Sequence, residues 1–251
     1  MKLLYKNPSL EYSIDSILLF HEGAQSDFWS EPLFLEFPQI DKSKFNRLTR
    51  LEKREYLREI FSGILKANEM KEKLIRYQDY WDTNSINIQK ALEDAFQLQL
   101  SDKFNNIIGN ITLNPICPRF LESNTFDIYY RNSERGALGM ALHEIIHFVW
   151  FHVWNLYFQD NKKEYEMPHL TWVLSEMVVD TIMRHDKRLY SINPYFDEGC
   201  AYDYFYAMKI ERKPILETLM ELYVNNSTLA FMEKSYNYCL EHETEIRSQM
   251  K

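Results

Sequence analysis

Glycine is scarce in this chain, at 6 of 251 residues, which is about a third of average usage. Tight turns often depend on glycine, so we expect few of them, and this favours helices. A chain of 251 residues can bury a full core in one large domain or in two lobes.

The chain also lacks an excess of positive charge, long apolar runs and a full set of paired cysteines. Its 29 Lys and Arg residues are scattered among 37 Asp and Glu residues, which disfavours a nucleic-acid partner. No apolar run approaches the roughly 20 residues needed to cross a bilayer, and the N-terminus lacks the apolar core of a signal peptide. Cys117, Cys200 and Cys239 are odd in number and far apart. They favour reduced thiols over a disulfide framework, so we expect a cytoplasmic protein without a membrane partner.

One short motif carries most of the chemical information. Residues 143–147 read His-Glu-Ile-Ile-His within an apolar segment, 137–151, that contains no proline. The segment predicts a helix, on which His143 and His147 project from the same face. Two such imidazoles can hold one zinc ion, with Glu144 close enough to act as general base toward a water on that ion. Histidines satisfied by core hydrogen bonds are the alternative. However, unsatisfied buried polar groups cost about 1–3 kcal/mol each, so three together need an organising partner, and a metal supplies one.

A catalytic zinc needs a third protein ligand and an open position. The metzincin pattern fails, because Trp150 and Val153 stand where its glycine and third histidine would be. Asp160 is available, but it lies in a polar stretch typical of a turn that ends the helix. The remaining candidate is Glu176, with Asp180 one turn later on the same predicted helix.

The segment around that pair, 170–183, has helical apolar spacing. Here the chain resembles the gluzincins, the thermolysin-like HExxH metallopeptidases, in which a Glu-x-x-x-Asp pair follows the HExxH helix. The resemblance implies that Glu176 completes the ligands of one zinc ion per chain and that Asp180 accepts a hydrogen bond from His143. Physical chemistry agrees, because a ligating imidazole is held by an acceptor on its other nitrogen, commonly a carboxylate. A solvated face of a surface helix is the alternative, disfavoured by the apolar neighbours.

Residues 106–113 and 125–130 are rich in β-branched and aromatic side chains, and each is predicted to form a strand. Strands followed by the HExxH helix are also the gluzincin order. The resemblance implies that an edge strand pairs with the extended substrate backbone, so Gly109 and Asn110 are expected to line the substrate cleft. Simple core strands are the alternative.

The resemblance also implies a tyrosine or histidine that polarises the substrate carbonyl opposite the zinc. Tyr202 is assigned to substrate binding on this ground. The candidates for the polarising group are Tyr195, Tyr202, Tyr204 and Tyr206.

The expected fold class is therefore α+β and predominantly helical. We expect a zincin-like small sheet packed on the HExxH helix and followed by a helical C-terminal lobe. The lobes would be residues 1–160 and 161–251, or one continuous domain. Two short hydrophobic stretches in the first 45 residues, 14–20 and 33–37, could be strands. Further helices are expected at 47–82, 85–105, 200–212, 214–224 and 227–250.

Three functional hypotheses follow from these patterns. The first is a zinc metallopeptidase of gluzincin type that hydrolyses bonds in a peptide or protein. The second is a narrow-specificity regulatory protease of the kind that cleaves one repressor. The third is a catalytically silent zincin-like scaffold that works through protein contacts. Glu144 argues against the third, because a purely structural zinc site has four protein ligands and needs no adjacent base.

Overall fold

The computed structural model describes residues 1–22, 26–64, 67–100, 103–158, 162–192 and 201–250. The chain divides into two compact units, one of residues 1–83 and 102–141 and the other of residues 84–101 and 142–251. The division falls inside two long helices, α5 (Ala67–Phe96) and α6 (Glu134–Tyr157), rather than near residue 160. The HExxH residues and Glu176 therefore belong to the same unit.

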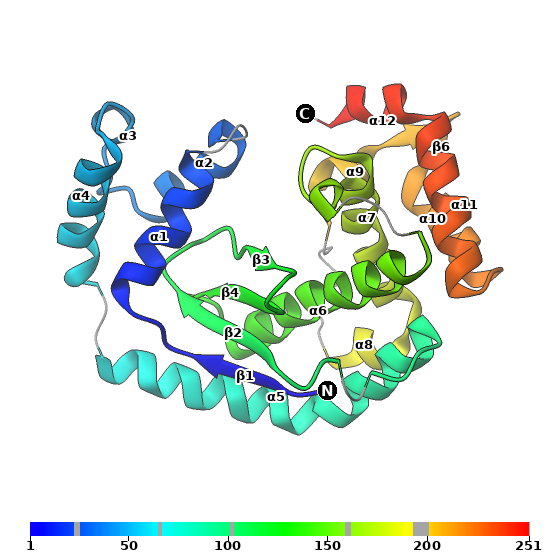
Figure 1. The fold of residues 1–251 in the computed structure, drawn as a ribbon, viewed down its shortest axis with the longest axis horizontal. Helices are drawn as coiled ribbons and strands as arrows, with labels where there is room; N and C mark the ends of the chain where they lie inside the picture. The colour runs from blue at the N-terminus through cyan, green and yellow to red at the C-terminus, as the bar shows by residue number, and fades with distance from the viewer. Residues whose placement is uncertain (23–25, 65–66, 101–102, 159–161, 193–200, 251) are drawn as a thin grey trace. The chain divides into compact units, whose positions relative to one another are not determined.

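The first unit contains a mixed four-stranded sheet in the order β1-β2-β4-β3 (Figure 1). β2 is parallel to both β1 and β4, whereas β3 runs antiparallel to β4. The two predicted strands are confirmed as β2 and β4. The expectation that β2 is an edge strand is wrong, because the N-terminal strand β1 pairs along its other side. The strands are β1 (Leu3–Lys6), β2 (Ile107–Thr112), β3 (Arg119–Phe120) and β4 (Thr125–Tyr129).

The hydrophobic stretches 14–20 and 33–37 belong to the helices α1 and α2, the second ending one residue beyond α2, so the expectation that they could be strands is wrong. The side chain of Ser9 accepts a hydrogen bond from the first turn of α1 and caps it. Ile14 and Leu18 are buried at a four-residue spacing, as are Leu33 and Phe37, and this spacing is that of a helix face. The helices are α1 (Leu10–His21), α2 (Ser26–Glu36), α3 (Lys42–Phe45) and α4 (Arg50–Ser62).

His21 ends α1 as a buried, uncharged histidine. Its Nδ1 lies 2.9 Å from Ser30 Oγ, and its ring meets Phe34 and Phe45 edge to face. Burial, helped by the positive charge of Lys53, lowers the pKa of His21 to about 4. In the unfolded chain the His21 imidazole becomes protonated as the pH falls through about 6.5, whereas in the folded chain it becomes protonated only near pH 4.

We expect this difference to make the first unit acid-labile. The contribution of His21 to the free energy of unfolding is largest above pH 6.5. It decreases as the pH falls toward 4, by at most about 3 kcal/mol. In the double variant His21→Leu/Ser30→Ala, which removes both hydrogen-bonding partners, this part of the loss should vanish. Urea unfolding at pH 7 and pH 4.5 measures the difference between the two proteins. Parallel pH profiles would show that His21 does not contribute.

The second unit is almost entirely helical. Alongside the ends of α5 and α6 it contains one short turn of 3-10 helix and one small hairpin in its described residues. The prediction of a helix at 214–224 is confirmed by α10, and that at 227–250 is confirmed with a break at His242. The elements are η1 (Lys162–Tyr165), α7 (Leu170–His185), α8 (Lys187–Ile192), α9 (Asp203–Ala207), β5 (Lys209–Ile210), β6 (Lys213–Pro214), α10 (Ile215–Val224), α11 (Thr228–Glu241) and α12 (Glu243–Gln249).

The helix expected over 200–212 is wrong beyond Ala207, because the chain there forms the β5–β6 hairpin. Glu211 and Arg212 form its two-residue turn with φ angles of 51° and 72°. Such turns usually contain Asn-Gly or Asp-Gly. Because neither pair occurs here, the sequence does not predict this turn. Cys200, at the start of the expected helix, lies outside the described residues.

The fold class is α+β and predominantly helical with a small mixed sheet, as predicted. Among the helices in the described part of the chain, none combines the length and apolar character needed to cross a membrane.

Candidate metal centre

The helix predicted around the HExxH motif is confirmed as α6, which runs from Glu134 to Tyr157. His143 and His147 lie one turn apart on it and turn their rings toward each other. The ring centroids are 4.8 Å apart, and the two Nε2 atoms are 3.0 Å apart. Both imidazoles therefore converge on one point.

The predicted helix after the motif is confirmed as α7, and it is buried on every side from Leu170 to Met183. The solvated-face alternative for Glu176 is thus wrong, because this carboxylate is only 3% exposed. Its Oε2 lies 3.3 Å from His143 Nε2, and its Oε1 lies 3.4 Å from His147 Nε2. Two helices therefore bring three ligand-type side chains together.

The three side chains are close enough to share one metal ion. Metal–ligand bonds of about 2.0–2.2 Å at tetrahedral angles place neighbouring ligand atoms about 3.3–3.6 Å apart. The two Glu176 oxygens lie at 3.3 and 3.4 Å, each from a different histidine, and the histidine nitrogens are slightly closer to each other, at 3.0 Å. With one ligand atom from each residue, the three atoms lie within 4.8 Å of one another. Within the described residues, this is the one group of three or more His, Cys, Asp or Glu side chains close enough to share an ion.

Aromatic packing fixes the orientation of the second histidine. His147 is fully buried and stacks on Phe151, with ring centroids 6.2 Å apart and planes at 17°. Phe151 in turn stacks on Tyr165 at 4.4 Å. The His147 side chain therefore has little freedom to rotate away from His143 and Glu176.

Glu144 follows His143 directly on α6 and is also buried. The α6 helix thus carries both ligand-type histidines and a buried carboxylate that is next to the first of them in the sequence.

Asp180 lies one turn beyond Glu176 and is 2% exposed. Its carboxylate accepts hydrogen bonds from Arg184 Nε at 2.8 and 2.9 Å and from the Tyr206 hydroxyl at 2.5 Å. The hydrogen bond expected from His143 stays a prediction. Sequence reasoning missed the role of Arg184, although its i+4 spacing from Asp180 was an available signal.

Tyr202 and Tyr204 extend the aromatic surroundings of the site. Tyr202 contacts Trp172 with ring centroids 6.0 Å apart and stacks on Tyr204 at 5.3 Å, with planes at 2°. The Tyr204 hydroxyl is buried and has no hydrogen-bond partner in the described part of the chain. Burial, together with the negative charge of Glu176, raises the pKa of Tyr204 above its ordinary value, so this phenol remains a hydrogen-bond donor.

Tyr204 is therefore a candidate whose hydroxyl is available to a ligand. The Tyr206 hydroxyl donates to Asp180, while Tyr195 lies outside the described residues, as does the rival ligand Asp160.

Gly109 and Asn110 have structural roles within the first unit. A Cβ at Gly109 would lie 2.9 Å from ring carbons of Tyr5, so the glycine allows that ring to pack on β2. The Asn110 amide donates to the Tyr12 hydroxyl at 2.9 Å. Since β2 has strand partners on both sides, a substrate backbone cannot pair with the strand at these two residues.

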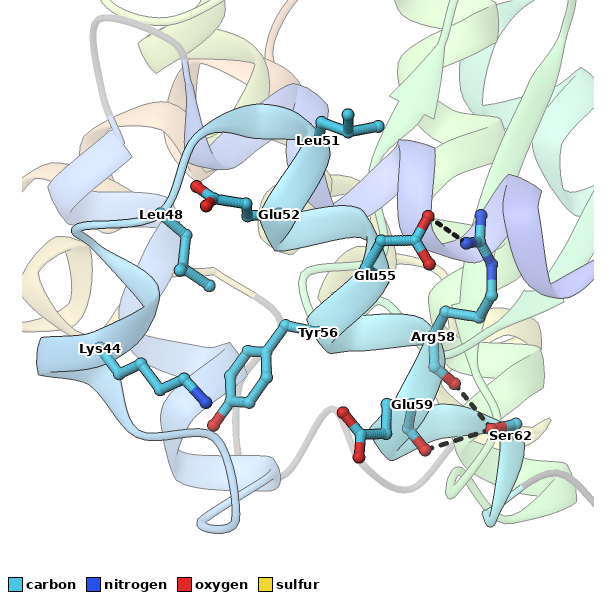
Figure 2. A pocket seen from close by; sticks show the side chains of 9 residues that line it. All are labelled: Lys44, Leu48, Leu51, Glu52, Glu55, Tyr56, Arg58, Glu59 and Ser62. Carbon is cyan, nitrogen blue, oxygen red and sulfur yellow. Dashed lines mark hydrogen bonds and ion pairs between the residues drawn. The ribbon is translucent and has the colours of Figure 1, made fainter.

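The first unit also has an open groove of about 630 Å³ beside α3 and α4. Figure 2 shows that charged side chains surround it, with Tyr56 and two leucines between them. The lining contains no histidine or cysteine, so the groove is not a second centre of the same kind. It is lined by Lys44, Leu48, Leu51, Glu52, Glu55, Tyr56, Arg58, Glu59 and Ser62.

Comparison of the chain with protein families, curated proteins and solved structures found no significant match. The candidate site therefore stands on its own geometry.

Proposed function

We propose that this chain is a zinc-dependent metallopeptidase with a zincin-like arrangement, in which His143, His147 and Glu176 hold the metal. The observation that carries the proposal is that His143 and His147 of α6 and Glu176 of α7 approach one another to 3.0–3.4 Å, and that one ligand atom from each lies within 4.8 Å of the others. Zinc prefers this combination of imidazole and carboxylate, and three protein ligands leave one position open.

The roles of the other residues follow from their chemistry. When bound, zinc supplies a Lewis acid that polarises the substrate carbonyl and makes water acidic. Glu144 takes a proton from the attacking water and delivers it to the leaving amine. Tyr204 donates a hydrogen bond to the carbonyl oxygen as negative charge develops there. Its buried hydroxyl supports this role, because an unsatisfied donor costs about 1–3 kcal/mol unless a ligand pairs with it.

The proposal includes a peptide or protein substrate and a cytoplasmic location. Cys239 is a buried free thiol, which is consistent with a reducing compartment.

Metal content tests this proposal directly. We expect the purified chain, dialysed without chelator, to contain about one zinc per molecule by elemental analysis. Glu176→Ala should lower the content strongly, because it removes one of three ligands. Glu217→Ala, at an exposed position on α10, is the matched control and should leave it unchanged. Absence of transition metal, together with no zinc binding at micromolar concentration, would favour the silent scaffold.

A second test concerns the carboxylate beyond the ligand. If Asp180 supports His143, we expect Asp180→Ala to weaken zinc binding by about 10–100-fold, the usual effect of losing a partner of a ligand. Competition titration against a chelator of known affinity measures the change. An unchanged affinity would remove Asp180 from the site, whereas a far larger loss would make it a direct ligand.

A further inference from the structure

Four residues of α7 follow one another at intervals of four and form one ridge of the helix. They are Trp172, Glu176, Asp180 and Arg184. This ridge carries an aromatic ring, the proposed metal ligand, a buried carboxylate and the cation paired with it.

The segment from Tyr202 to Tyr206 follows this ridge in the same order. Tyr202 contacts Trp172, and Tyr204 lies close enough to Glu176 for the carboxylate to affect its phenol. Tyr206 donates to Asp180 at 2.5 Å. Each of the three tyrosines therefore interacts with a different residue of this ridge.

The end of this segment is held more firmly than an ordinary surface turn. The guanidinium of Arg184 lies 5.6 Å from the centre of the Tyr206 ring and also binds Asp180. The Tyr206 hydroxyl in turn accepts the backbone N–H of Ala201 at 3.2 Å. Charge-assisted hydrogen bonds to a buried carboxylate are among the strongest in proteins. These contacts therefore hold residues 201–207 against α7.

We propose that the Tyr206–Asp180–Arg184 cluster is a latch that couples metal binding at Glu176 to the seating of residues 201–207 on α7. Tyr206 is then a positioning residue, since it acts on the site through Asp180 and through the placement of Tyr204. This inference rests on the proposed metal site. It goes further in assigning a device that links the metal to the segment that would contact substrate.

Coupling of this kind is reciprocal. If the seated segment holds α7 in the form that binds metal, the metal must favour the seated segment by the same factor. The effect should therefore be visible both in zinc affinity and in the protection of residues 201–207, without any assay of activity.

The test compares the full chain with Tyr206→Phe, which keeps the ring and removes the hydroxyl. We expect zinc affinity to fall about 10-fold, at the lower end of effects on partners of ligands. In the unaltered chain, zinc should slow amide hydrogen exchange of peptides covering residues 201–207. In Tyr206→Phe, that added protection should decrease by about the same factor as the affinity.

Tyr223→Phe is the matched control. It also removes one tyrosine hydroxyl hydrogen bond within the second unit, in this case to the Ala95 carbonyl at 3.2 Å. It should leave zinc affinity and exchange of residues 201–207 unchanged.

Three results would overturn the coupling. If Tyr206→Phe binds zinc as tightly as the unaltered chain, or if zinc does not change exchange of residues 201–207, the latch is absent while the metal site stands. If the unaltered chain binds no zinc, the proposed function and the coupling fail together.

Discussion

Glu144→Gln should keep its zinc and its fold but lose peptide hydrolysis by about 10²–10⁴-fold, the usual cost of losing a general base. Glutamine has nearly the same shape as glutamate, so it can occupy the same buried position on α6. It cannot accept the proton of the attacking water. The loss should therefore appear in turnover, while the ligands His143, His147 and Glu176 are untouched.

The measurement needs a broad substrate, because the sequence does not define which peptides the site would accept. Digestion of a peptide mixture followed by mass spectrometry detects cleavage at any preferred sequence that the mixture contains. Zinc content of the variant, measured in parallel, separates loss of the base from loss of the metal. Glu217→Gln serves as the exposed control. Full activity in Glu144→Gln would refute the assignment of the base.

Removal of the metal should lower the stability of the second unit substantially. A ligand that binds only the folded state at a free concentration of about 1,000 times its Kd contributes about 4 kcal/mol. For a unit of this size, that corresponds to a decrease in Tm of about 10–15 °C. The buried positions of His147 and Glu176 mean that this site exists only when α6 and α7 are packed together.

Differential scanning calorimetry with excess zinc and with excess chelator measures this shift. Glu176→Ala is the informative comparison, because it should melt at the same temperature under both conditions. Identical scans of the unaltered chain with zinc and with chelator would contradict a metal site in the second unit.

The core of the candidate site was predictable because it depends on short, regular spacings. His143 and His147 lie one helical turn apart, as do Glu176 and Asp180, and both helices have continuous apolar flanks. The sequence could also exclude the metzincin pattern from single residues. Burial of α7 on all sides was less evident, since Glu176 and Asp180 could equally have marked a solvated face.

What could not be predicted depends on contacts between distant segments. β1 is only four residues long, yet its pairing turns β2 from an edge strand into an interior one. The β5–β6 hairpin turns on Glu211 and Arg212, which carry no glycine signal. Likewise, Tyr206 reaches Asp180 from 26 residues away, and no local periodicity identifies such a partner.

The burial of α7 has a consequence for how this site tolerates sequence change. The helix that presents Glu176 is also packed into the core on all sides, and interiors respond to volume changes as small as one methylene. A substitution at Val173 or Met177, both fully buried, would shift the carboxylate as well as the packing. Variants that recover function after damage to the site should therefore arise among core side chains, and metal affinity would report on the quality of core packing.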